Sequence, residues 1–107
     1  MTVFPVVNLN GDSVEKLLQQ HWDVLKHSRK LAEALAAAAP HGRNYQTLPA
    51  HESPTYEARR EWLTLLAAND LIKQWAEASL ADLMRQNVER NGHEKSYEIT
   101  RRVMSDA

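Results

Sequence analysis

The side chains best suited to chemistry lie together in one segment, residues 40–53, which reads PHGRNYQTLPAHES. Gly42 can adopt a positive φ and Asn44 tolerates one, so the backbone can turn there and present its amide N–H groups. Arg43 offers a planar set of donors that suits a phosphate or a carboxylate. The segment exceeds the roughly two to eight residues that usually join helices, and connections of this length are often functional.

Three ring-bearing side chains belong to the same segment. His41 and His51 can gain a proton near neutral pH, and Tyr45 combines an apolar ring with a polar tip. Such a set suits a phosphate, a carboxylate or the edge of a nucleobase. The alternative is structural: Arg43 pairs with a carboxylate of a neighbouring helix and Tyr45 closes the end of a bundle. The predicted ligand- or partner-binding residues are His41, Gly42, Arg43, Asn44, Tyr45 and His51.

Other catalytic and metal-binding patterns are missing from the sequence. There is no cysteine, which excludes thiolate metal sites, iron–sulfur clusters and disulfides. The five histidines form no HExxH motif and no i,i+4 pair, and no Glu-x-x-His motif occurs. G-x-S-x-G, P-loop and G-x-G-x-x-G motifs are also absent. We therefore expect no enzyme activity, no metal and no cofactor.

Two long helices are predicted to hold the segment in place. Asp12 is suited to cap the first helix, with Glu15 in the position of a capping-box partner. This helix, with its cap, is predicted at residues 12–39, because Pro40 disfavours helical geometry in the residue before it.

The second helix is predicted at residues 54–91. Ser53 and Pro54 fit its N-cap and first turn, and Asn91-Gly92 fits its end. Residues 1–11 form a short extended arm, and residues 92–107 form a tail or a short third helix. The predicted fold is all-α: one domain built as a long antiparallel helical hairpin.

Each predicted helix has an apolar face with three- and four-residue spacing, as in helical bundles. In the first helix this face comprises Val14, Leu17, Leu18, His21, Val24, Leu25, Ser28, Leu31, Ala32, Leu35 and Ala38. In the second helix it comprises Trp62, Leu65, Leu66, Asn69, Ile72, Ala76, Leu80, Leu83, Met84 and Asn87.

Four polar residues interrupt these faces: His21 and Ser28 on the first helix, and Asn69 and Asn87 on the second. These four residues allow two interpretations. Buried polar residues can fix the register between helices, as a core asparagine does in coiled coils. Alternatively, they line a polar pocket or a metal site inside a bundle. The first interpretation is preferred, because the carboxylates of a bundle metal site are missing.

The second helix also has an apolar strip on nearly the opposite side, around Ala67, Leu71, Trp75 and Ala78. One hairpin cannot cover this strip, and small domains without disulfides usually need a partner. We therefore predict a homo-oligomer, most simply a dimer whose four long helices form a bundle, with Leu71, Trp75 and Ala78 in the interface. The alternative is that the arm or the tail covers the strip.

The charge balance and the N-terminal residues bear on nucleic-acid binding and on the location of the protein. Thirteen basic and fourteen acidic residues leave a net charge of −1, so direct binding to nucleic acid is not expected. The first residues have no basic region and only a short apolar run broken by Pro5, unlike a signal peptide. No stretch is long enough to cross a membrane. A cytoplasmic protein is expected.

Two motifs carry a resemblance to a family. Residues 6–13 (VVNLNGDS) and 40–45 (PHGRNY) resemble a group of small phage and prophage proteins that read roughly V-x-L-N-G-[TD]-S … P-[HN]-G-R-[DN]-Y. The resemblance spans about residues 6–90, and Gln46 stands where such proteins often have a second aromatic residue. It implies a phage accessory gene that acts in the host cytoplasm, and it implies no particular activity.

Two functions fit these observations. The first is a non-enzymatic binding protein that interferes with a host defence system, by binding a host protein or by sequestering a small anionic or nucleotide ligand. A protein target is favoured, because one arginine is a narrow basis for phosphate binding. The alternative is a structural or assembly adaptor of the phage particle.

Overall fold

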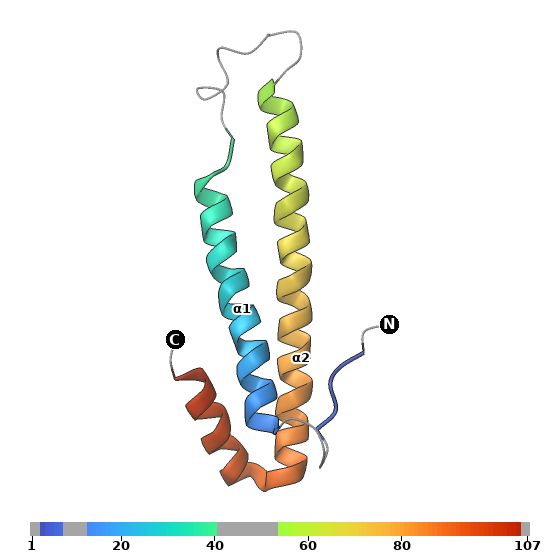
Figure 1. Ribbon diagram of the computed structural model, residues 1–107, viewed down its shortest axis with the longest axis vertical. Coiled ribbons are helices and arrows are strands. Elements are labelled where there is room, and N and C mark those ends of the chain that lie inside the picture. The colour runs from blue at the N-terminus through green and yellow to red at the C-terminus, as the bar shows by residue number, and fades with distance from the viewer. Residues whose placement is uncertain (1–2, 8–12, 41–53, 106–107) are drawn as a thin grey trace.

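The computed structural model describes residues 3–7, 13–40 and 54–105. Within these ranges the chain forms two helices, α1 (Val14–Ala37) and α2 (Pro54–Met104), and no strand. The helices run antiparallel and contact each other along their length (Figure 1), in a molecule of 62 × 30 × 19 Å. The predicted all-α hairpin is therefore confirmed.

The first helix begins one residue later than predicted. Its N-cap is Ser13 rather than Asp12, and the Ser13 hydroxyl accepts a hydrogen bond from the amide of Lys16 at 3.1 Å. Lys16 therefore occupies the position that a capping-box glutamate would need, and Glu15 only adds a favourable negative charge to the first turn. The helix ends at Ala37, two residues before the predicted end.

The second helix begins at Pro54 as predicted and is interrupted at Gly92. There φ is 79° and ψ is 170°, a conformation that is essentially restricted to glycine. Nothing lies within 4 Å of the place of a Cβ atom, so the backbone conformation and not the available space requires glycine. Beyond this break the chain turns back and remains helical to Met104 (Figure 1). The predicted short C-terminal helix is therefore present, as residues 93–104.

The hydrophobic core occupies only one half of the hairpin. We call residues 3–7, 14–27 and 76–105 the core half, and residues 28–40 and 56–75 the open half. All buried hydrophobic side chains of the described residues belong to the core half: Val7, Val14, Leu18, Leu25, Ala76, Leu80, Leu83, Ile99 and Val103. In the open half, the buried residues among those described are Ser28, Pro40 and Asn69.

The arm and the C-terminal segment both lie against the core half. Gln86 holds the arm with two hydrogen bonds at 2.9 Å, one from the amide of Val7 and one to the carbonyl oxygen of Pro5. On the C-terminal segment, Arg102 pairs with Glu15 at the start of α1, at 2.8 Å. These contacts leave the predicted strip open, since the side chain of Leu71 is 66% exposed.

Candidate functional site

The predicted loop site, His41 to Tyr45 and His51, lies outside the described residues, but the base of the loop is described. There α2 supplies two donors to the carboxyl end of α1. Trp62 Nε1 donates to the carbonyl oxygen of Leu35 at 2.7 Å, and Arg59 Nε donates to that of Pro40 at 3.0 Å. The last turn of α1 has no basic residue of its own, so Arg59 also provides the positive charge that a helix C-terminus favours. The chain therefore enters residues 41–53 from an anchored point.

The predicted polar contact between the two helices exists at Ser28 and Asn69. The Ser28 hydroxyl donates to Asn69 Oδ1 at 2.9 Å, and Asn69 Nδ2 donates to the carbonyl oxygen of Ser28 at 3.0 Å. Each residue is only 4% exposed. Because the bonds run in both directions between α1 and α2, a slip of one turn would strand several buried polar atoms. This geometry agrees with the interpretation that the pair fixes helix register.

Asn87 makes its hydrogen bonds within α2. It does not join α1 to α2; its Nδ2 donates to the carbonyl oxygen of Ser96 at 3.2 Å, and its Oδ1 accepts from Asn91 Nδ2 at 2.8 Å. The residue is fully buried. It therefore anchors the C-terminal segment after the break at Gly92, and the prediction that it sets the register between the two long helices is wrong.

The histidine of the apolar face is buried against a tryptophan. The ring of His21 lies 4.9 Å from that of Trp75 between centroids, and its Nδ1 atom has no hydrogen-bond partner among the described residues. Burial lowers the pKa of His21 below its usual 6.5. The hydroxyl of Ser79, on the next turn of α2 after Trp75, is likewise buried without a partner in the described part of the chain. No group of three or more potential metal ligands occurs among the described residues.

Two apolar grooves lie along the hairpin, the first at the boundary between the two halves and the second within the open half. The first, which we call the Leu31 groove, has a volume of about 350 Å³ and is lined by Asp23, Val24, His27, Ser28, Leu31, Asn69 and Ile72. The second, the Leu63 groove, has a volume of about 430 Å³ and is lined by Ala32, Leu63, Leu66, Ala67, Asn69, Asp70 and Lys73. Asn69, which lies between the helices, borders both. Leu63 and Ile72, one from each groove, are nine residues apart on α2, which is two and a half turns, so the two grooves occupy opposite faces of the hairpin.

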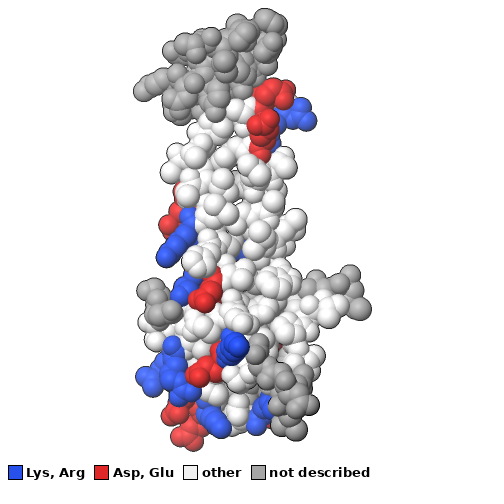
Figure 2. All heavy atoms as spheres, viewed as in Figure 1, with Lys and Arg blue, Asp and Glu red and all other residues white. Residues whose placement is uncertain are grey.

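Charged side chains are unevenly distributed over the face of the molecule shown in Figure 2. Figure 2 shows most Lys, Arg, Asp and Glu side chains of the visible face towards the lower part and the edges of the molecule, with mostly uncharged surface in between. Seven large hydrophobic side chains of the open half are substantially exposed: Leu31, Tyr56, Leu63, Leu65, Leu71, Ile72 and Trp75. These side chains lie on different sides of the hairpin, since Leu63 lines one groove and Leu31 and Ile72 line the other. Exposed apolar surface marks a protein interface where it is contiguous, as it is within each groove.

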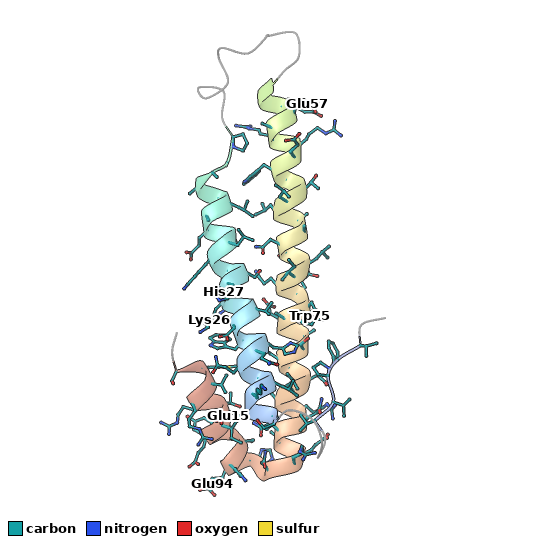
Figure 3. The ribbon with its side chains drawn as sticks, in the orientation of Figure 1. Glu15, Lys26, His27, Glu57, Trp75 and Glu94 are labelled. Atoms are coloured by element: carbon teal, nitrogen blue, oxygen red, sulfur yellow. The ribbon has the colours of Figure 1, made fainter. Side chains whose placement is uncertain are left out.

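The predicted oligomer residues have mixed surroundings. Leu71 and Ala78 are exposed, whereas Trp75 is 40% exposed and lies partly against His21. Figure 3 places Trp75 on α2 and His27 on α1 at the middle height of the hairpin. Leu31 and Ile72 were expected to be covered within the hairpin, yet each is 48% exposed. The apolar spacing identified their face correctly but gave no information on what covers it.

Comparisons of the chain with protein-family models, with curated proteins and with solved structures gave no match. Within the described residues, no helix combines the length and the apolar character that a membrane crossing needs. The function is therefore inferred from the two grooves and the exposed hydrophobic side chains.

Proposed function

We propose that this chain is a non-enzymatic accessory protein of a phage that binds a host protein through the Leu63 groove and the neighbouring loop. The carrying observation is the concentration of exposed hydrophobic side chains in the open half, where no hydrophobic side chain of the described residues is buried. A monomer gains nothing from leaving this much apolar surface in water, whereas a partner would be bound by covering it.

The lining of the Leu63 groove favours a helix as the bound element. The lining combines the small side chains of Ala32 and Ala67 with the larger apolar side chains of Leu63 and Leu66. This combination fits the apolar face of an amphipathic helix. Asp70 and Lys73 lie at the border of the groove and offer charges of both signs to the polar side of such a helix.

The groove also adjoins the base of the loop. Leu63 lines both the groove and a smaller hollow formed with Ala39, Pro40, Arg59 and Trp62. A partner bound in the groove would therefore lie close to Pro40, the last described residue before the loop. The mostly apolar lining favours a protein over a small anion, for which several convergent donors would be expected. The assignment to a phage comes from the resemblance of the two sequence motifs to those of phage proteins, and the role against a host system is proposed from the small size of the chain and the absence of catalytic motifs from its sequence.

Two matched substitutions test the proposal. Ala67→Trp fills the Leu63 groove, and Ala78→Trp places the same side chain at another exposed alanine of α2. Tagged proteins would be used to capture partners from a host lysate, with quantification by mass spectrometry. We expect one host protein to be retained by the unmodified chain and by Ala78→Trp. Its recovery should fall about tenfold or more with Ala67→Trp, a loss of about 1.4 kcal/mol or more of binding free energy.

Arg43→Ala should weaken the same interaction without lowering the melting temperature, if the loop contributes recognition. Enrichment of phage capsid or tail proteins in place of a host protein would contradict the proposal and support the adaptor role. Equal losses with the two tryptophan variants would exclude the Leu63 groove as the binding surface.

A further inference from the structure

We propose that a second copy of this chain covers the Leu31 groove, so that two open halves pack antiparallel as a four-helix bundle. This proposal does not depend on the binding of a host protein, because the Leu63 groove proposed for that protein lies on the other face. It also assigns the predicted oligomer to a surface different from the strip around Leu71.

The described open half lacks the buried apolar core that holds a helical hairpin together. Helical hairpins are held mainly by the packing of their apolar faces, because helix propensity alone barely stabilises short helices. In the described open half no hydrophobic side chain is buried, although the apolar spacing of both helices continues through it. Leu31 and Ile72 are each 48% exposed and Leu65 is 60% exposed. These three residues lie at the apolar positions of the helices, as core residues do, but no other part of the described chain covers them.

The Leu31 groove is also complementary to the same groove on a second copy. Both helices present branched apolar side chains there, Val24 and Leu31 from α1 and Ile72 from α2, so the same surface on another molecule offers equivalent ridges. A two-fold interface uses the same patch on both subunits. The open part of α2, residues 56–75, is about 30 Å long at 1.5 Å per residue, and that of α1, residues 28–37, is about 15 Å long, with each helix about 10 Å wide. The pair would bury about 900 Å² in total, which is the size of a weak or transient interface.

The arm decides the direction of the pairing. Arg90 lies eighteen residues after Ile72, or five full turns of 3.6 residues, so both side chains leave the same side of α2. Arg90 Nη1 donates to the carbonyl oxygen of Val7 at 3.3 Å. The arm therefore lies on the same face as the Leu31 groove, but in the core half. Parallel copies would meet arm against arm, whereas antiparallel copies bring the two Leu31 grooves together and keep the two arms apart.

Neighbouring residues on α2 provide a matched test. Ile72 borders the Leu31 groove, while Leu71 belongs to the strip and is more exposed, at 66%. We expect sedimentation equilibrium to show a dimer of the 12.2 kDa chain. Ile72→Glu should weaken it by about 100-fold or more, because a carboxylate would be buried without a partner. Leu71→Glu should leave the dimer intact.

A second measurement covers the case in which Ile72→Glu does not fold. The chain has no cysteine, so Ile72→Cys and Leu71→Cys each introduce a single thiol. The rate of maleimide labelling at Ile72→Cys should fall as the protein concentration rises through the dissociation constant, and the rate at Leu71→Cys should not. A monomer at all concentrations would overturn the proposal. So would a dimer in which Leu71, and not Ile72, is protected or is sensitive to charge.

Discussion

Replacing Asn69 with alanine should destabilise the hairpin more than any other polar substitution in the open half. Asn69 and Ser28 are each 4% exposed, and their side chains exchange hydrogen bonds of 2.9 and 3.0 Å between α1 and α2. The substitution removes both bonds and leaves the carbonyl oxygen of Ser28 without its side-chain donor. The Ser28 hydroxyl keeps a weaker acceptor, the backbone carbonyl oxygen of Asn69 at 3.3 Å.

These contacts set the expected magnitude. A typical internal hydrogen bond contributes about 1 kcal/mol, and a buried polar group left unpaired costs about 1–3 kcal/mol. Asn69→Ala should therefore lower the free energy of unfolding by about 2–4 kcal/mol. Ser28→Ala strands only Asn69 Oδ1 and should cost about 1–2 kcal/mol. Combining the two should cost less than the sum, with a coupling energy of about 1 kcal/mol, because both remove the hydrogen bond between the Ser28 hydroxyl and Asn69 Oδ1.

Urea unfolding followed by circular dichroism, at one fixed protein concentration, would measure these values. The fixed concentration matters because association also stabilises the folded state. Asp70→Ala is the control, since Asp70 is the next residue and is exposed, and it should change the free energy of unfolding by no more than about 0.5 kcal/mol. If Asn69→Ala were as mild as this control, the Ser28–Asn69 pair would not hold the register of the hairpin.

Three further predictions concern the core half. Because burial lowers the pKa of His21, the unfolded state binds its proton first. Stability should therefore be complete above the unfolded pKa of 6.5 and should fall as the pH drops below it. His21→Leu should remove this part of the pH dependence, and parallel stability profiles for the two proteins would contradict the assignment. Gly92→Ala should cost about 1–3 kcal/mol through backbone strain alone, measured against the control His93→Ala, and an effect equal to that of the control would refute the reason given. Gln86→Ala should release the arm, seen as faster proteolysis at Phe4 with the helical circular dichroism signal retained, and an unchanged cleavage rate would mean that other contacts hold it.

The sequence predicts the local features of this fold well. Pro54 begins the second helix and Gly92 interrupts it, as the backbone preferences of proline and glycine indicate. Ser28 and Asn69 meet because both lie on the apolar faces that two antiparallel helices must bring together. These predictions depend on properties of a residue and its near neighbours, which a sequence contains directly.

Features that depend on distant parts of the chain were not predicted. Asn87 lies on the same apolar face as Asn69, but its partner is set by the return of the chain after Gly92. The exposure of Leu31 and Ile72 could not be foreseen, because periodicity reveals the apolar side of a helix and not the layer against it. The hold of Gln86 on the arm joins positions about eighty residues apart. The loop residues predicted as a binding site lie outside the described part of the chain, so their role stays a prediction.

The central claim is that the open half is completed by a partner, while the core half is stable by itself. Hydrogen exchange measured at several protein concentrations tests it most directly, because exchange reports the local free energy of opening along the chain. We predict that protection of residues 28–37 and 56–72 rises with protein concentration, and that protection of residues 14–21 and 76–91 stays constant. Equal, concentration-independent protection of both halves would contradict the claim.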